Sequence, residues 1–541
     1  MRKYIFKNNH FTWLRILLVT LLVLGVFFRL VNLDRKVYWY DEGLTSLRVG
    51  GYTIPEVVQQ SFNGQVISVA DFRDRYLSPD SGRGFYGTLK SLAVEDPQHP
   101  PIYYLMTHLW MQWFGNSVAA IRSLPALISL LVFPCTYWLC IELFKSSLTG
   151  WIAMAIIAVS PFHVLFAQEA REYSLWTVTI LLTSATLLRA MRLKTLHSWG
   201  IYALTLAISL YTFLFSIFIA IGHGIYVISS ARFSKGVIAY LGAASVSFIA
   251  FIPWLLVVIN NHKRVNDSTS WMTNTAIPLL QLSSLWVKNV GCIFFKSTKY
   301  DLILLTVIII FVAYSFYFVF RHTAKTVWLF LLTLFGVTAL ALILPDITIG
   351  GQRSIQARFF IPCYLRIQLA VSHLIATKIS FKGVALWQQK FWLVVTLAIF
   401  TGGVISSAIY SQSEVPWTKL KNSRDYKIAR TINQATNPLV VVSNYPSYDT
   451  NVSYLFSFSH LLDAKVKLQL VDGNNIPKIP NGFSNIFIYN PAAISTAKTG
   501  LANEFKVLLF ELKQKQNYQA EPVKISQPIL LWRLVKTSVN S

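Results

Sequence analysis

Two adjacent carboxylates, Asp41 and Glu42, follow an apolar run at 14–33 in the segment VYWYDEGLTSL. Aromatic side chains, Tyr40 among them, stand directly before the pair. A carboxylate can act as a general base toward a hydroxyl group, and aromatic faces commonly line sites for amphipathic ligands. The alternative is a pair of solvated loop charges. We predict that Asp41 is the base and that Glu42 acts beside it, orienting a substrate or holding a divalent ion.

The polar stretch that begins there ends in EDPQHPPIYY. Its two prolines pre-set the start of the next helix, and Asp96 and His99 lie three residues apart on the approach to it. Asp41, Asp96 and His99 are residue types that bind divalent metal ions, but this spacing also fits a structural histidine, so metal binding stays open. We predict that Asp96 and Tyr103 position a substrate.

Several arginines stand at the ends of apolar runs. The segment AQEAREYSLW contains Gln168, Arg171 and Tyr173, and Arg122 and Arg358 hold similar places. One explanation is anchoring at the membrane boundary by long basic side chains. The other is a set of cations for a phosphate group at the membrane surface. We predict that Arg122, Arg171 and Arg358 bind phosphate with His99, and that Gln168, Tyr173 and Tyr40 position a substrate.

Composition places these residues in a membrane protein. The 541-residue chain is 54% hydrophobic and 13% charged, whereas soluble domains are about 25% charged. Its apolar runs are long enough to cross the hydrocarbon core as helices. The net charge of +25 comes from short basic clusters between these runs, which indicates membrane orientation rather than nucleic-acid binding. We predict about eleven crossings, at 14–33, 118–142, 150–167, 172–190, 198–212, 213–230, 237–258, 301–320, 326–344, 358–378 and 389–410.

The basic clusters predict the orientation of the chain. The clusters all fall on one side of the crossings, which is expected to be cytoplasmic, with the N-terminus as an uncleaved anchor on that side. The segment 101–114 is too short for a span and would reverse this pattern, so we expect an interfacial or re-entrant helix on the outer face. The residues used are Arg2, Lys3, Lys7, Arg15, Lys145, Arg189, Arg192, Lys194, Arg232, Lys235, Arg321, Lys325, Lys378 and Lys382.

Three polar pieces are expected outside the membrane: loops at 34–100 and 259–300, and the region 411–541. The last contains the short strand patterns PLVVVSN, KVKLQLVDG, SNIFIYN and ILLWRLVK, and helix patterns at RDYKIARTINQA and EFKVLLFELKQKQ. Strands that alternate with helices indicate a small α/β domain. The predicted architecture is therefore an all-α polytopic membrane domain, 1–410, followed by a C-terminal extracytoplasmic α/β domain, 411–541.

These motifs together resemble the GT-C superfamily of glycosyltransferases. The run from YDE through HPPIYYLMTHLWMQWFGNSVAAIRSLPALISLL to SPFHVLFAQEAREYSL is similar to bacterial relatives of family 39, the dolichyl-phosphate-mannose protein mannosyltransferases, and to the lipid A aminoarabinose transferases. QARFFIPCYL resembles their late Arg-aromatic element. The resemblance implies that Asp41 is the essential acid and that Arg122 and His99 match family positions. Gln98 replaces a metal-binding Glu of the aminoarabinose enzymes.

The predicted activity is that of a hexosyl or pentosyl transferase in the cell membrane. A polyprenyl-phosphate sugar is the expected donor, and a lipid, glycan or protein is the expected acceptor on the outer face. Polyprenyl phosphate leaves readily when cations surround it, and direct displacement inverts the anomeric centre. No cofactor is required by this reading, and a divalent metal ion stays open. The alternatives are a flippase for polyprenyl-linked glycans and a non-catalytic membrane scaffold.

Overall fold

The structure is a computed structural model that describes residues 12–541 apart from 232–234, 297–301, 381–384, 417, 419–422, 446–447, 474–477, 492–501, 526–528 and 537–541. Of the basic residues used above to predict orientation, Arg2, Lys3, Lys7, Arg232 and Lys382 lie outside the described residues. The chain forms two compact units. The helical unit comprises Met1–Leu33, Asp96–Tyr103 and Arg122–Gln412, and the α/β unit comprises Asp34–Glu95, Tyr104–Ile121 and Ser413–Ser541.

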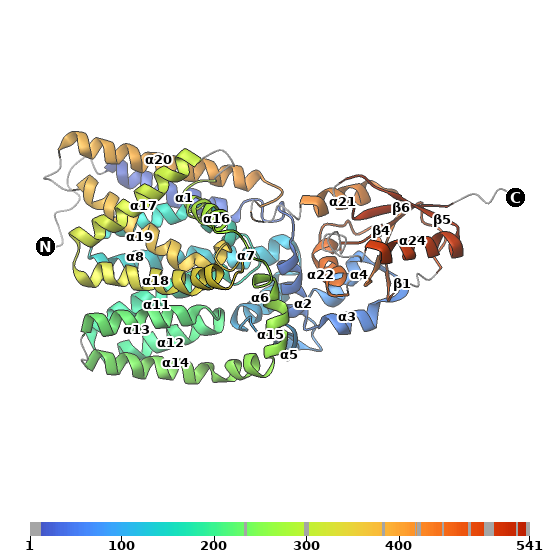
Figure 1. The fold of residues 1–541 in the computed structure, drawn as a ribbon, viewed down its shortest axis with the longest axis horizontal. Helices are drawn as coiled ribbons and strands as arrows, with labels where there is room; N and C mark the ends of the chain where they lie inside the picture. Colours follow the sequence, from blue (N-terminus) through green and yellow to red (C-terminus); the bar gives the residue numbers. More distant parts are fainter. Residues whose placement is uncertain are drawn as a thin grey trace. The chain divides into compact units, whose positions relative to one another are not determined.

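The helical unit is a bundle of long apolar helices (Figure 1). Its elements, some of which begin in the other unit, are α1 (Thr12–Leu30), α7 (Val118–Leu130), α8 (Val132–Phe144), α9 (Ser147–Ala158), α10 (Pro161–Ala167), α11 (Tyr173–Leu193), α12 (Leu196–Thr212), α13 (Ser216–Ala231), α14 (Lys235–Asn260), α15 (His262–Thr269), η2 (Ser270–Met272), α16 (Leu279–Gly291), α17 (Leu302–His322), α18 (Lys325–Thr348), η3 (Ala357–Phe360), α19 (Ile361–Ser380) and α20 (Leu386–Gln412).

Each predicted crossing is occupied by a helix or by a pair of helices. Within the described residues, eight helices are long and apolar enough to cross a membrane, or nine if α9 and α10 count as one bent span. The sequence count of about eleven is larger because it includes α12, with 17 residues, and α13, with 16. The prediction of a polytopic helical membrane protein is confirmed.

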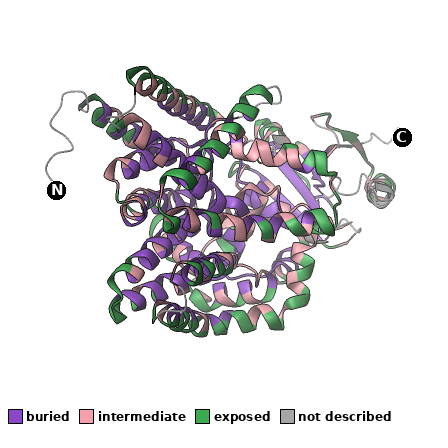
Figure 2. Cartoon of the chain, turned by 60° about the vertical axis from the view of Figure 1, so that its left-hand side comes forward, coloured by how far each residue is buried: buried purple, intermediate pink, exposed green. Residues whose placement is uncertain are grey.

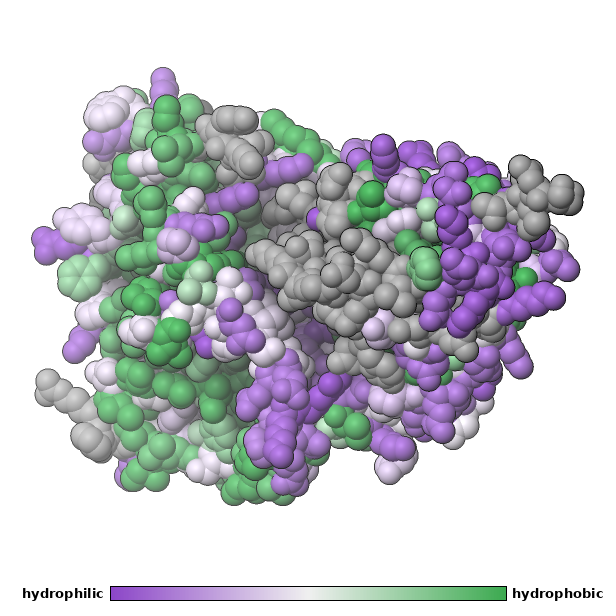
Figure 3. Space-filling model, turned by 45° about the vertical axis from the view of Figure 1, so that its right-hand side comes forward, coloured by the Kyte–Doolittle hydropathy of each residue, from purple (hydrophilic) through white to green (hydrophobic). Residues whose placement is uncertain are grey.

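The outer faces of this bundle are apolar, as a lipid environment requires. Leu241, Val246 and Ile249 on α14 and Ile303 and Val307 on α17 are all more than half exposed. In water, such faces would form large sticky patches. Figure 2 shows the buried residues inside the bundle and the exposed ones along its rim, and Figure 3 shows hydrophobic side chains over the helical unit. Lipid chains are the solvent that suits this surface.

The α/β unit contains a six-stranded mixed sheet of order β1-β3-β2-β4-β6-β5. Its elements are α2 (Tyr40–Gly50), α3 (Ile54–Ser61), β1 (Asn63–Ser68), α4 (Val69–Tyr76), α5 (Gly84–Glu95), α6 (Ile102–Phe114, which begins in the helical unit), α21 (Ser423–Gln434), β2 (Pro438–Ser443), α22 (Tyr448–Ser459), β3 (Lys467–Val471), β4 (Asn485–Tyr489), α24 (Ala502–Gln516), β5 (Tyr518–Pro522) and β6 (Leu531–Lys536). The predicted C-terminal α/β region is confirmed.

The loop after α1 contributes to this sheet. β1 pairs antiparallel with β3, so that Ile67 lies opposite Leu468, while β2 pairs in parallel with both β3 and β4. The buried faces of β2, β3 and β4 pack on side chains from α3 and α4, including Val57 and Phe72. The first polar stretch and the C-terminal region therefore form one folding unit with one shared core.

Segment 101–114, expected as an interfacial or re-entrant helix, is α6. The helix is confirmed, and its relation to the membrane stays a prediction.

Candidate functional site

The helical unit contains a sharp break that directs the chain into the segment with Arg171. Pro161 begins α10, which is bent by 63° from α9. The carbonyl groups at the end of α9 would lack partners in a membrane interior. Arg29 of α1 supplies them: its Nη1 donates to the Ala158 oxygen at 2.7 Å, and its Nη2 donates to the Ile157 oxygen at 3.0 Å. Gly25 permits this approach, because a Cβ there would lie 2.6 Å from the Ala158 Cβ.

Gln168 joins the turn after α10 to the end of α1. Its buried amide nitrogen donates to the carbonyl oxygens of Phe28 at 2.9 Å and Val31 at 2.8 Å. These bonds satisfy carbonyl groups at and just beyond the end of α1, and they fix the turn 168–172 to that helix end. The contact seen for Gln168 is thus architectural, and its predicted role in positioning a substrate stays a prediction.

Arg171 and Glu172, both buried, form a polar cluster with the partly exposed His99 at the start of α11. The Nδ1 of His99 lies 3.1 Å from Glu172 Oε1, and Arg171 Nη2 donates to the same oxygen at 3.2 Å. Arg171 Nη2 also lies 3.3 Å from both ring nitrogens of His99. Burial by itself raises the pKa of Glu172, but the charges of Arg171 and His99 outweigh it and lower that pKa to about 2. Glu172 is therefore ionised and fixes both side chains.

Two guanidinium groups lie near the ring of Tyr173. The Cζ of Arg171 lies 6.0 Å from the centre of its ring, and the Cζ of Arg358 lies 5.8 Å from the same centre. Arg358 also lies 5.8 Å from the ring centre of Trp271. Aromatic faces attract guanidinium groups and hold them without neutralising their charge. The structure thus brings together four of the predicted site residues, His99, Arg171, Tyr173 and Arg358.

The segment that leads to Arg358 is fixed by Asp346, a buried carboxylate near the end of α18. Its Oδ1 accepts from Arg353 Nη1 at 2.9 Å. Its Oδ2 accepts from the backbone N of Ser354 at 2.6 Å and from the Ser354 hydroxyl at 2.7 Å. The Ser354 hydroxyl in turn accepts from Trp286 Nε1 at 3.0 Å. Charge-assisted hydrogen bonds of this kind define a loop conformation closely.

The other predicted residues of this unit take simpler positions. Asp96 begins a turn in which its carbonyl oxygen accepts from the His99 backbone N at 2.9 Å. Arg122 is 1% exposed and donates from Nη1 to the Leu33 oxygen at 2.8 Å. Tyr103 is fully buried at the start of α6. Their roles toward a substrate stay predictions.

No group of three or more His, Cys, Asp or Glu residues within the described ranges is arranged to hold a metal ion. His99, one of the candidate ligands, has the guanidinium group of Arg171 within 3.3 Å of both ring nitrogens. A second cation there would be repelled. The residues present at His99 do not fit a metal site, and the mechanism below uses no metal ion.

In the α/β unit, α2 places Asp41 and Glu42 in its first turn. Glu42 is fully buried, and its Oε2 accepts from the Trp39 backbone N at 3.2 Å, which caps the helix. Asp41 is half-buried beside it, where the positive end of the helix dipole favours a negative charge. Glu42 therefore caps the helix, and Asp41 is the more exposed of the two carboxylates. Their roles toward a substrate stay predictions.

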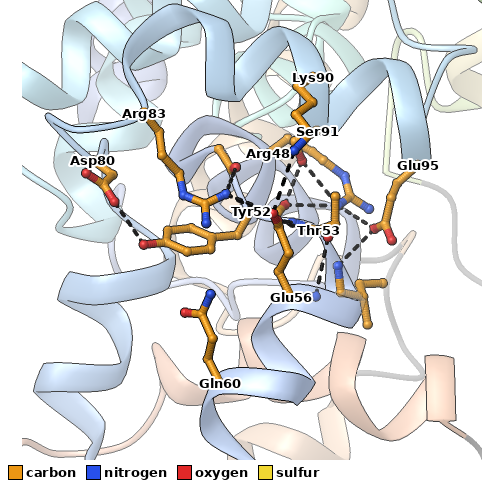
Figure 4. Close-up of polar contacts among 12 residues, drawn as sticks. Arg48, Tyr52, Thr53, Glu56, Gln60, Asp80, Arg83, Lys90, Ser91 and Glu95 are labelled. Atoms are coloured by element: carbon orange, nitrogen blue, oxygen red, sulfur yellow. Dashed lines mark hydrogen bonds and ion pairs between the residues drawn. The ribbon is translucent and has the colours of Figure 1, made fainter.

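A polar network holds the other end of α2 (Figure 4). Arg48 Nη1 and Glu95 Oε2 form a buried ion pair at 2.6 Å, and Glu95 also accepts from the Ile54 backbone N at 3.2 Å. Beside it, Arg83 lies 3.9 Å above the Tyr52 ring centre. This network ties α2 to α3 and α5, so the direction of the helix that carries Asp41 is fixed by charge as well as by packing.

The sequence analysis assigned no role to three residues that the structure places in contact with predicted site residues. Glu172 and Trp271 contact the cations of the helical unit, and Tyr454 of α22 packs on Tyr40 with ring centres 5.0 Å apart. For Glu172, the only indication in the sequence was its position directly after Arg171. Trp271 and Tyr454 come from segments without any motif, so only the fold could reveal them.

Comparison with known proteins finds one family model and several solved structures of similar fold. Residues 98–257 match the family model described as dolichyl-phosphate-mannose-protein mannosyltransferase. A crystal structure of ArnT from Cupriavidus metallidurans bound to undecaprenyl phosphate aligns over 98% of this chain and 99% of its own, with a TM-score of 0.51 and 12% identity. Its apo form gives a TM-score of 0.50 with 13% identity, over 98% of this chain and 99% of its own.

An oligosaccharyltransferase from Archaeoglobus fulgidus, tethered to an acceptor peptide, aligns over 98% of this chain and 75% of its own, with a TM-score of 0.50 and 12% identity. The chain has the GT-C fold. This finding and the family model confirm the resemblance to GT-C membrane glycosyltransferases related to family 39. No protein of curated function matches the sequence. The matched region includes His99, Arg171 and Tyr173, whereas Asp41 and Arg358 lie outside it.

Proposed function

We propose that this GT-C protein transfers a sugar from a polyprenyl-phosphate carrier to an acceptor hydroxyl on the extracytoplasmic face of the membrane, with inversion at the anomeric carbon. The observation that carries the proposal is that Arg171, which contacts His99, and Arg358 both lie near the ring of Tyr173. Three cationic or cation-forming side chains at the ends of apolar helices suit a phosphate group whose lipid chain lies in the membrane. The ArnT structure with undecaprenyl phosphate supports the same ligand class.

On the donor side, the bond that breaks joins the anomeric carbon to a phosphate oxygen. Its electron pair goes to the phosphate, whose negative charge increases. Arg171 and Arg358 stabilise that charge, because fixed cations in a partly buried site need no rearrangement as the charge develops. Glu172 keeps Arg171 and His99 in place and limits the net positive charge before the donor binds.

On the acceptor side, the attacking oxygen forms the new glycosidic bond and gives its proton to Asp41. One base is enough, because the leaving group needs no protonation. A single displacement from the face opposite the phosphate gives inversion and makes a second carboxylate nucleophile unnecessary. Glu42 contributes by holding the first turn of α2, in which Asp41 lies.

The proposal can be tested with binding and transfer in parallel. Wild-type protein in detergent is titrated with undecaprenyl phosphate, and membranes containing it are given radiolabelled polyprenyl-phosphate sugars. Arg171→Ala should weaken binding at least tenfold, since a charged hydrogen bond to phosphate contributes about 1.5–3 kcal/mol. Arg189→Ala is the matched control, because Arg189 lies exposed near the other end of α11. Equal binding by wild type and Arg171→Ala would contradict the assigned phosphate site.

A further inference from the structure

Helix α22 of the C-terminal region packs directly on the helix that carries Asp41. The closest approach is at Gly43, where an added Cβ would lie 2.6 Å from the Ser457 backbone N and 3.0 Å from its Cα. Backbone, unlike the end of a flexible side chain, cannot move aside cheaply. Gly43 is therefore required for α2 and α22 to meet. One turn N-terminal of Ser457, α22 places Tyr454 beside the residues at the start of α2.

Tyr454 lies half-buried next to Asp41. Its ring centre is 5.0 Å from that of Tyr40, with the planes tilted by 55°. Burial, together with the nearby carboxylates of Asp425 and Asp41, raises the pKa of Tyr454 to about 12. The phenol is thus neutral and able to donate a hydrogen bond at physiological pH.

Arg424, at the start of α21, lies near enough to Tyr454 for its charge to act on the phenol. The positive charge of Arg424 lowers the pKa of the Tyr454 phenol, whereas the two carboxylates raise it. Its Nη1 is buried and has no hydrogen-bond partner among the described residues. A buried guanidinium nitrogen without a partner costs free energy unless a ligand supplies an acceptor. Tyr454 and Arg424 therefore bring two hydrogen-bond donors to the part of the α/β unit in which Asp41 lies.

We propose that Tyr454 and Arg424, together with Tyr40 and Asp41, form an acceptor subsite that binds a saccharide. The aromatic pair offers an apolar face of the kind on which sugar rings pack. The phenol and guanidinium groups donate to sugar oxygens, while a carboxylate accepts from sugar hydroxyls. A site for a lipid chain would instead be lined by apolar side chains. The inference rests on the proposed function, because it assigns the acceptor that Asp41 deprotonates.

Binding measured without catalysis separates this inference from the proposed function. Saturation-transfer NMR is recorded on the full chain in detergent, with methyl glucoside, methyl mannoside, methyl galactoside and a hexapeptide containing Ser and Thr as probes. At least one glycoside should receive saturation from the wild-type protein. Tyr454→Phe and Arg424→Gln should each weaken its binding about two- to tenfold, the range for one lost hydrogen bond.

Tyr518→Phe is the matched control, because Tyr518 is also half-buried but lies on the edge strand β5. Thermal unfolding of each variant checks that it is folded. Binding of the peptide alone, absence of binding by every glycoside, or glycoside binding that is unchanged in both variants would each overturn the proposal. Retained sugar transfer by Asp41→Asn would instead reject the proposed base while leaving the binding result intact.

Discussion

Replacing Glu95 with glutamine should destabilise the α/β unit far more than the same change in an exposed ion pair. Arg48 Nη1 and Glu95 Oε2 are 2.6 Å apart, with side chains only 2% and 6% exposed. At an effective dielectric constant of about 20, two unit charges at this distance attract by about 6 kcal/mol. Desolvation offsets part of this, and removing one partner of a buried pair typically costs about 3–5 kcal/mol.

We therefore expect Glu95→Gln to lower the free energy of unfolding of this unit by about 3 kcal/mol, because Arg48 is left charged and buried. The assay is chemical unfolding of the purified protein, followed by protection of α2 and α5 from hydrogen exchange. The double variant Arg48→Met with Glu95→Gln should recover part of the loss, since it removes the unpaired charge.

Glu511→Gln provides the control. Glu511 pairs with Lys515 at 3.3 Å on an exposed face of α24, where such pairs contribute about 0–1 kcal/mol. A loss below about 0.5 kcal/mol in Glu95→Gln, or a loss equal to that in Glu511→Gln, would refute the reasoning that this buried charge pair fixes α2.

Three further predictions concern the groups around Arg171 and Arg358 in the helical unit and the helix that carries Asp41 in the α/β unit. The carboxylate of Glu172, with its pKa lowered to about 2 from 4.5, stabilises the fold fully above pH 4.5, and this contribution is lost as the pH falls toward 2. The pH dependence of thermal unfolding in that range should therefore be weaker in Glu172→Gln than in wild type. Asp346→Asn should raise the donor KM several-fold at unchanged acceptor KM, as measured by initial rates, because the segment before Arg358 loses a charged anchor. Gly43→Val should abolish transfer while undecaprenyl phosphate still binds, because its side chain forces α2 away from Ser457; retained transfer would speak against the α2–α22 contact.

The sequence predicted most of the elements because their signals are local. The apolar runs identified the helices of the bundle, and β2, β3, β4 and β6 follow from short apolar segments between turn residues. β1 could not be predicted, because Asn63–Ser68 is short, mostly polar, and gains its partner only from β3 about 400 residues later. Its pairing needs the complete fold.

The same limit applies to the candidate site. His99 and Arg171 could be selected by residue type and motif, but their link through Glu172 joins positions 73 residues apart. Asp41 was selected from its place after the first apolar run, whereas the packing of Tyr454 on Tyr40 depends on α22, for which no helix was predicted. Local patterns identify groups with suitable chemistry, and tertiary contacts decide which of them meet.

The most direct test of the central claim is sugar transfer in membranes that contain this protein, with radiolabelled polyprenyl-phosphate sugars as donors and Asp41→Asn as the paired variant. We predict transfer from at least one such donor by the wild-type protein, and a loss of at least a hundredfold in Asp41→Asn, the scale on which general bases contribute. Undecaprenyl phosphate should still bind to the variant. Equal transfer by both proteins, or none by folded wild type from any of these donors, would contradict the account.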